Sequence, residues 1–101
     1  LVTGIEELLS KIGDNEVNIT PNPTNTITNL LTNFTQPGQL QYQILDVGSK
    51  LLFRSQSQNA LITKQTKIEL QNYPAGIYYI LVFFKPNSGI AKTGVYKIVK
   101  L

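Results

Sequence analysis

From residue 18 onward, the sequence is a series of short runs in which apolar and polar residues alternate. The clearest run is LQYQILD (residues 40–46), which places a leucine, a tyrosine and an isoleucine on one face and two glutamines on the other. Side chains of a β-strand point to opposite faces in turn, so this is the pattern of a half-buried strand. A period of two, repeated along most of the chain, restricts the fold to one built from strands.

Turn sequences separate these runs. VNIT (residues 17–20) is followed by the turn-rich PNPTNT, and the next strand, ITNLLTNF, is closed by Pro37 and Gly38. The sequence predicts a hairpin from Leu40 to Arg54, with a turn at DVGS in which Gly48 takes a positive φ. LITKQTKIEL continues the pattern, with Ile68 and Leu70 as its clearer apolar positions, and AKTGVYKIVKL is the last strand.

The run GIYYILVFF (residues 76–84) is apolar on both faces, which is typical of a central strand or of an edge packed on another element. We expect Tyr78, Ile80 and Val82 to face the core, and the intervening Tyr79, Leu81 and Phe83 to cover the other side. About seven short strands spaced by turns predict one all-β domain, an immunoglobulin-like antiparallel β-sandwich. The cysteines and tryptophan of antibody domains are absent.

The first 16 residues have a different pattern. Ile5, Leu8, Leu9 and Ile12 recur with the spacing of one helical face, and Gly13 follows as a stop signal. Two turns of helix are not stable alone. The stretch lacks the features of a signal peptide and has no initiator methionine. We therefore expect residues 1–16 to be a linker or the end of a preceding domain, in a chain that is a fragment of a longer protein.

Composition excludes several function classes. The net charge is +3, but the basic residues are scattered, which argues against nucleic-acid binding, and no apolar run is long enough to span a membrane. The chain has no cysteine and no histidine, so thiolate chemistry and the commonest metal ligand are missing. Asp14 and Glu16 read as solvated loop acids rather than cation ligands. We predict no catalytic residues, no metal site and no cofactor.

Four motifs resemble those of a known protein family. ITPNPTN (residues 19–25), ILDVGSKLLF (44–53), IELQNYPAGIYYILV (68–82) and the terminal TGVYKIVKL occur in this order. In order, spacing and terminal position, residues 17–101 resemble the C-terminal sorting domain of proteins exported by the type IX secretion system of Bacteroidetes-type bacteria. The sequence departs from the family pattern in small ways: Thr20 stands where Tyr or Phe is common, and Tyr73 where Leu is common.

The resemblance implies a folded address without chemistry of its own. Domains of this family are recognised in the periplasm by the translocation machinery and carried through the outer membrane with an N-terminal cargo, and a surface sortase then removes them. The cargo reaches the outer-membrane surface or the medium. The residues that match the family motifs are Pro21, Asn22, Pro23, Asp46, Gly48, Pro74, Ala75, Gly76, Tyr78, Gly94, Lys97, Lys100 and the final Leu101.

Most of these residues also have a structural interpretation. Pro21 and Pro23 block ladder pairing and can end one strand and start the next, while Gly48 and Gly76 permit turn geometry. Lys97 and Lys100 are not required by core packing and serve either as edge-protecting charges or as contacts for an acidic partner. We predict that the recognition surface is the last hairpin, from Ile77 to Leu101, because it offers a long strand that another protein can pair with or clamp.

A second hypothesis belongs to another class. Tyr42, Tyr73, Tyr79 and Tyr96 would form a stacking row if the domain were an accessory adhesion or carbohydrate-binding module of a secreted enzyme. Such a module requires these rings to be exposed. An exposed edge strand would also offer a route to self-association.

Overall fold

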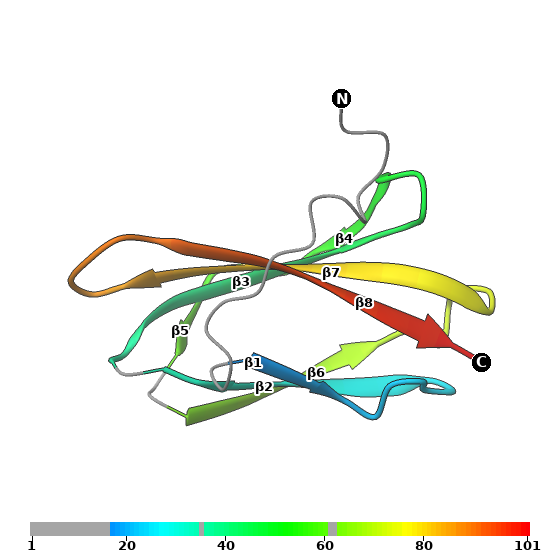
Figure 1. Ribbon diagram of the computed structural model, residues 1–101, viewed down its shortest axis with the longest axis horizontal. Coiled ribbons are helices and arrows are strands. Elements are labelled where there is room, and N and C mark those ends of the chain that lie inside the picture. The colour runs from blue at the N-terminus through cyan, green and yellow to red at the C-terminus, as the bar shows by residue number, and fades with distance from the viewer. Residues whose placement is uncertain (1–16, 35, 61–62) are drawn as a thin grey trace.

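The computed structural model describes residues 17–34, 36–60 and 63–101. Within these ranges the chain forms eight strands and no helix (Figure 1): β1 (Val17–Thr20), β2 (Ile27–Asn33), β3 (Gly38–Leu45), β4 (Leu51–Arg54), β5 (Gln58–Ala60), β6 (Thr63–Glu69), β7 (Gly76–Pro86) and β8 (Lys92–Lys100). The same ranges contain no helix long and apolar enough to cross a membrane. The helix predicted between Ile5 and Ile12 lies outside the described residues.

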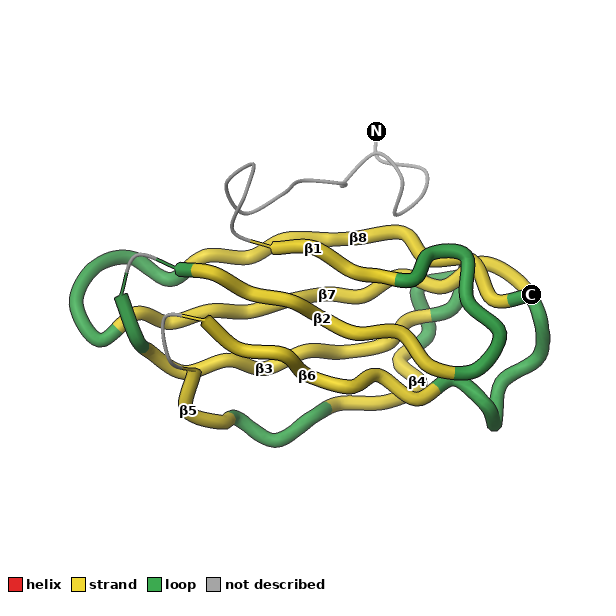
Figure 2. Tube along the Cα trace, turned by 90° about the horizontal axis from the view of Figure 1, so that it is seen from below, coloured by secondary structure: helices red, strands yellow, loops and turns green. Residues whose placement is uncertain are grey.

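The strands form two sheets that stack face to face (Figure 2). One sheet has the order β1-β2-β6, and the other has the order β4-β3-β7-β8, with β5 pairing with the opposite end of β3 from β4. All strand pairs are antiparallel. The predicted all-β antiparallel sandwich is confirmed, and the arrangement is compatible with the immunoglobulin-like type.

The sequence predicted about seven strands, and the additional strand is β5. Only three residues long, it has no alternating pattern that could reveal it. It follows β4 along the same edge of β3 after an interruption at Ser55. There the backbone N–H of Ser55 donates to the Tyr42 carbonyl at 2.9 Å, but the Tyr42 N–H donates to the Ser55 hydroxyl instead of a backbone carbonyl.

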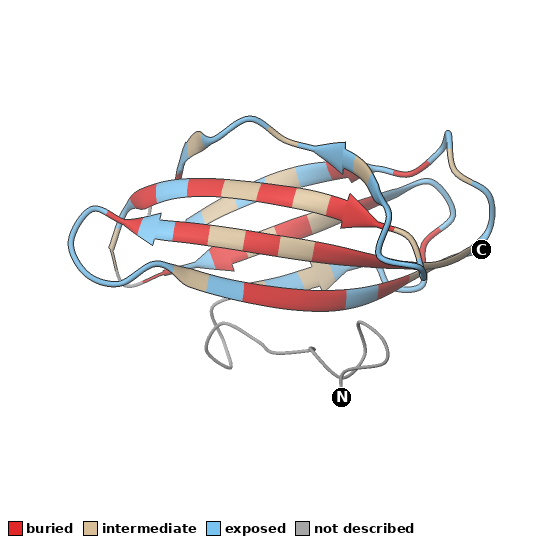
Figure 3. Cartoon of the chain, turned by 90° about the horizontal axis from the view of Figure 1, so that it is seen from above, coloured by how far each residue is buried: buried red, intermediate tan, exposed pale blue. Residues whose placement is uncertain are grey.

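The core fills the space between the two sheets, and buried residues alternate with exposed ones along the strands (Figure 3). The predicted inward positions of β3 are confirmed, as are Ile68 and Leu70, which are fully buried. The rings of Phe34 and Phe84 stack with centroids 3.7 Å apart and join the two sheets. The main cluster consists of Leu30, Phe34, Leu40, Tyr42, Ile44, Ala60, Ile68, Leu70, Tyr78, Ile80, Val82, Phe84, Tyr96 and Ile98.

β7 is the central strand that its sequence predicted. It pairs with β3 on one side and with β8 on the other. Its inward residues belong to the main core, and Tyr79 on the opposite face is buried in a second cluster with Leu45 and Val95. Burial on both faces explains why this run has no polar alternation.

The predicted hairpin is confirmed by β3 and β4, but the residue with positive φ in its turn is not the predicted one. The residue with positive φ is Ser49, at 69°, and not Gly48. A Cβ built on Gly48 would lie 3.5 Å from Asp46 Oδ1, an ordinary contact. Asp46 holds the turn, because its Oδ1 accepts hydrogen bonds from the backbone N–H groups of Gly48 (2.8 Å) and Lys50 (2.9 Å). The expected conformational role of Gly48 was therefore wrong.

Gly38 is the glycine that close packing requires. It begins β3 opposite Pro86, and a Cβ at this position would lie 2.2 Å from the carbonyl oxygen of Lys85. The clash is with backbone at the end of the central strand, so a side-chain rotation cannot relieve it. β3 and β7 would have to move apart at this point.

We expect Gly38→Ala to lower the free energy of unfolding by about 2 to 3 kcal/mol, because it overpacks a buried backbone contact. Gly48→Ala is the matched control and should change stability by less than about 0.5 kcal/mol, since its site is open and exposed. Urea denaturation of both variants measures the difference. Equal stabilities would contradict the assignment of Gly38 as the constrained position.

Candidate recognition site

The loop that follows β1 lies against the outer edge of β8. Thr24 N–H donates to the Val99 carbonyl at 2.9 Å, and Leu101 N–H donates to the Thr24 carbonyl at 2.8 Å. Thr24 also forms a parallel bridge with Lys100. The first and the last of the predicted motifs, far apart in sequence, are therefore joined by backbone hydrogen bonds.

Asn22 extends this contact with its side chain. Its Nδ2 donates to the Lys97 carbonyl at 2.9 Å, and its Oδ1 accepts from the Val99 N–H at 3.0 Å. One side-chain amide thus supplies the donor and the acceptor that a neighbouring strand residue would supply. Asn22 and Thr24 together cover the C-terminal part of the β8 edge.

Buried threonine hydroxyls fix the same loop from within. Thr28 is fully buried and donates through Oγ1 to the Pro21 carbonyl at 2.7 Å. Thr24 is 4% exposed and donates through Oγ1 to the Ile27 carbonyl. Pro21 and Pro23, each preceded by a cis peptide bond, end β1 as predicted and are exposed.

The terminal motif has residues in different environments. Gly94 is buried in β8 opposite Val82, away from the end of the strand. Lys97 is exposed and Lys100 is half-buried. Because side chains alternate along a strand, these two lysines point to opposite faces of the sheet and do not form a single basic patch.

The other two motifs lie in turns at the same end of the sandwich. Leu45, which precedes the Asp46 turn, pairs with Tyr79, and Gly76 pairs with Lys100. Pro74 and Ala75 are exposed in the turn before β7, and Gly76, for which turn geometry was predicted, has a positive φ of 152°. The structure therefore gathers the four motifs at one end, with Gly94 as the residue that lies apart.

Tyr78 closes the turn of the third motif. Its hydroxyl donates to the Pro74 carbonyl, and its ring lies 5.8 Å from that of Tyr73. Burial raises the pKa of the Tyr78 hydroxyl, and Tyr73 and Asp46 raise it further. Tyr78 thus acts as a core residue that also positions the exposed Pro74.

The tyrosines proposed as a stacking row do not form one. Tyr42, Tyr79 and Tyr96 are 6%, 2% and 8% exposed, and Tyr79 lies in a different cluster from the other two. Of the four, Tyr73 alone is half-buried. Tyrosine suits both a core and a binding surface, so the sequence could not distinguish these roles. The exposed aromatic row that the second hypothesis requires is therefore not formed.

Sequence reasoning missed a pocket of about 200 Å³ beside the Asp46 hairpin. It is lined by Tyr42, Ile44, Phe53, Lys67, Glu69, Asn72 and Tyr73. Burial raises the pKa of the Tyr42 hydroxyl, with Glu69 and Tyr73 adding to the effect. Five of these seven residues, Ile44, Phe53, Glu69, Asn72 and Tyr73, belong to the second and third motifs, but neither motif alone indicates a pocket, because it forms only where the separate segments meet. Among the described residues no group of three or more acids could hold a metal ion, and Asp14 and Glu16 lie outside them.

We expect Asn22→Ala to lower the free energy of unfolding by about 1 to 2 kcal/mol, because it removes two hydrogen bonds to the β8 edge. Asn25→Ala, in an exposed position of the same loop, is the control and should be nearly neutral. Chemical denaturation measures both. If the two variants were equally stable, the Asn22 contact would contribute nothing to the fold.

A comparison with protein families matches the chain to the secretion system C-terminal sorting domain over residues 18–98. Neither the curated proteins nor the solved structures provide a match. Domains of the matched family are sorting signals for type IX secretion, not catalysts, and they mark a cargo for export to the cell surface or the extracellular space. The match covers most of the chain, including the first three motifs and the terminal motif as far as Ile98, and the chain therefore belongs to the family of secretion system C-terminal sorting domains.

Proposed function

We propose that the secretion machinery recognises the end of the sandwich at which the four motifs meet, and that it does so in the periplasm. The observation that supports this is the set of hydrogen bonds from Asn22 and Thr24 to β8. They place the exposed prolines of the first motif beside the last residues of the chain. A partner could then bind distant parts of the sequence as one continuous surface.

The motif residues divide into two groups under this proposal. Asp46, Gly76, Tyr78 and Gly94 maintain the turns and strands, whereas Gly48 has neither a conformational role nor a side chain to offer a partner. The exposed residues Pro21, Pro23, Pro74, Ala75, Lys97 and Leu101, with the half-buried Lys100, supply the contacts. Asn22 belongs to both groups, because it is exposed and also bonds to β8.

The loop after β1 limits how a partner could bind the last hairpin. Between Lys97 and Leu101 the outer edge of β8 is already occupied by Asn22 and Thr24. A partner that paired with β8 along this stretch would have to displace the loop. We propose instead that it contacts the side chains of the combined surface of loop and strand.

Residues 17–101 are proposed as the sorting domain, and residues 1–16 as a linker or the end of the preceding cargo domain. The family match begins at residue 18, next to the first residue of β1, which supports this boundary. We further propose that a surface sortase separates the domain from its cargo. The domain itself performs no catalysis and uses no cofactor.

A reporter fused to residues 17–101 tests the sorting role. In a bacterium with an intact type IX system, the reporter should reach the cell surface or the medium, and in a strain without the system it should stay in the periplasm. A reporter that remained in the periplasm of both strains would contradict the proposed boundary or the proposed role. Circular dichroism of the purified fusion shows whether the domain is folded.

Single substitutions test the recognition surface. We expect Lys97→Gln and Lys100→Gln each to reduce export severalfold without changing the melting temperature, because each removes a charge from one face of the surface. Lys85→Gln, at the opposite end of β7, is the control. Wild-type export by both variants would show that these lysines only protect the edge.

Deleting Val99 to Leu101 tests the contribution of the strand end. The deletion removes the groups that bind Asn22 Oδ1 and both backbone groups of Thr24, so we expect lower stability and loss of export. A shortened domain that is folded and still exports the reporter would contradict the proposal.

A further inference from the structure

The two open sides of the sandwich differ. On one side, β1 and β8 are the outermost strands, and the loop from Pro21 to Thr24 connects them. On the other side, the outermost strands are β6 in one sheet, and β4 and β5 in the other (Figure 2). In the part of the chain that the structure describes, β6 pairs with β2 alone.

The outward backbone groups of β6 follow from its pairing. Leu70 N–H donates to the Thr26 carbonyl at 2.7 Å, in register with the β2–β6 ladder. Antiparallel hydrogen bonds involve alternate residues, so Ile68 and Thr66 also bond to β2. The N–H and C=O groups of Gln65 and Lys67 therefore point away from the sheet and are available to another strand.

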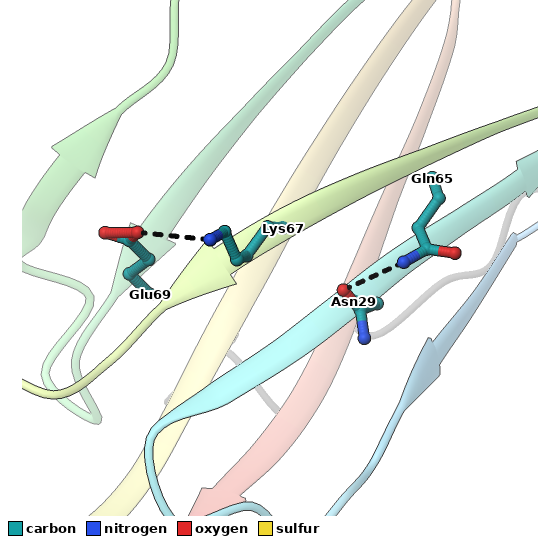
Figure 4. A network of polar contacts seen from close by, with 4 residues as sticks. All are labelled: Asn29, Gln65, Lys67 and Glu69. Atoms are coloured by element: carbon teal, nitrogen blue, oxygen red, sulfur yellow. Dashed lines mark hydrogen bonds and ion pairs between the residues drawn. The ribbon is translucent and has the colours of Figure 1, made fainter.

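Side chains at this edge leave it accessible. Gln65 Nε2 donates to Asn29 Oδ1 at 3.3 Å across the outer face, and Lys67 Nζ lies 3.9 Å from Glu69 Oε1 (Figure 4). The lysine and glutamate side chains are 60% and 54% exposed, so their ion pair contributes little and can rearrange. Thr66, on the inward face of β6, has a buried hydroxyl for which the described residues provide no hydrogen-bond partner.

The pocket lies beside this edge, between β6 and the β3–β4 hairpin. Phe53, which is 43% exposed, forms one wall, and its ring centroid lies 5.7 Å from that of Tyr42. The volume of about 200 Å³ is below the range of roughly 300 to 1,000 Å³ that is usual for small-molecule sites. It is suited to one apolar side chain of a larger partner.

The charged residues of β6 indicate which residues of the partner would flank the inserted side chain. β6 carries two cations, Lys64 and Lys67, against one acid, Glu69, and of these Lys67 and Glu69 also line the pocket. The nearby carboxylate of Asp46 is occupied by hydrogen bonds within its own turn. The excess of cations favours acidic residues on either side of the inserted side chain.

We propose that the outer edge of β6 binds an extended acidic segment of another protein by strand addition, with one aromatic or aliphatic side chain of that segment in the Phe53–Tyr73 pocket. Main-chain hydrogen bonds to Gln65 and Lys67 provide affinity, and the pocket sets the register. This site lies on the side of the sandwich away from β8. Its pocket adjoins the Asp46 hairpin and the turn at Asn72–Tyr73, so the two proposed sites are neighbours, but the strand addition at β6 is argued from separate observations.

The test uses the 101-residue chain, labelled with ¹⁵N, and a synthetic peptide in which Asp or Glu alternates with Val around a central Phe. On titration with the peptide, amide exchange at Gln65 and Lys67 should slow about tenfold or more, because both N–H groups become hydrogen-bonded. Signals of Phe53 and Tyr73 should shift at the same peptide concentrations. A peptide with Lys in place of every acid should bind at least about tenfold more weakly.

Gln65→Pro and Gln65→Ala separate strand addition from other binding. Both substitutions remove the bond to Asn29, but the proline alone removes the outward N–H, and neither breaks the ladder with β2. The peptide should bind the alanine variant and not the proline variant. Lys67→Pro and Lys67→Ala repeat the comparison, in case one proline variant fails to fold.

Three results would overturn the proposal. The first is equal binding of the acidic peptide by folded proline and alanine variants, or no binding by the wild-type chain. The second is protection of Gln65 and Lys67 that grows with protein concentration in the absence of peptide, which would assign the edge to a second copy of this chain. The third is a response of Phe53 and Tyr73 to N-acetylglucosamine but not to the peptide, which would assign the pocket to a sugar.

Discussion

The contact between the loop at Asn22–Thr24 and the edge of β8 determines how the rest of this domain is organised. A long edge strand with unpaired backbone groups is prone to unwanted pairing. Here the side chain of Asn22 and the backbone of Thr24 occupy the last part of that edge. The same contact holds β1 of one sheet beside β8 of the other, so it closes one side of the sandwich and leaves the side between β6 and β4 open.

This arrangement relates the family motifs to one another physically. In the sequence the four motifs look like independent turns. Strand pairing brings nearly all of their residues to one end of the fold. Buried members such as Tyr78 maintain the shape of that end, and exposed members such as Pro21 and Lys97 form its surface. A sorting signal built in this way depends on folding, because the unfolded chain does not bring its first and last motifs together.

The strands could be predicted because each one carries its own pattern. The alternation in β3 identified its inward residues, and the apolar run of β7 identified the central strand. Contacts across the fold left no such local signal: Asn22 and Lys97 are 75 positions apart, and nothing near Asn22 indicates that its amide substitutes for a strand. Local turn chemistry was also insufficient at Gly48, because the hydrogen bonds of Asp46 place the positive φ on Ser49.

The central claim is that the loop and β8 form one hydrogen-bonded unit, and amide hydrogen exchange of the 101-residue chain tests it most directly. Val99 and Leu101 direct their N–H groups away from β7, so without the loop these amides would exchange as rapidly as those of a free strand edge. We predict that both are protected to an extent comparable with Ile98, which bonds to β7 within the sheet. Rapid exchange at Val99 and Leu101, with Ile98 still protected, would contradict the account.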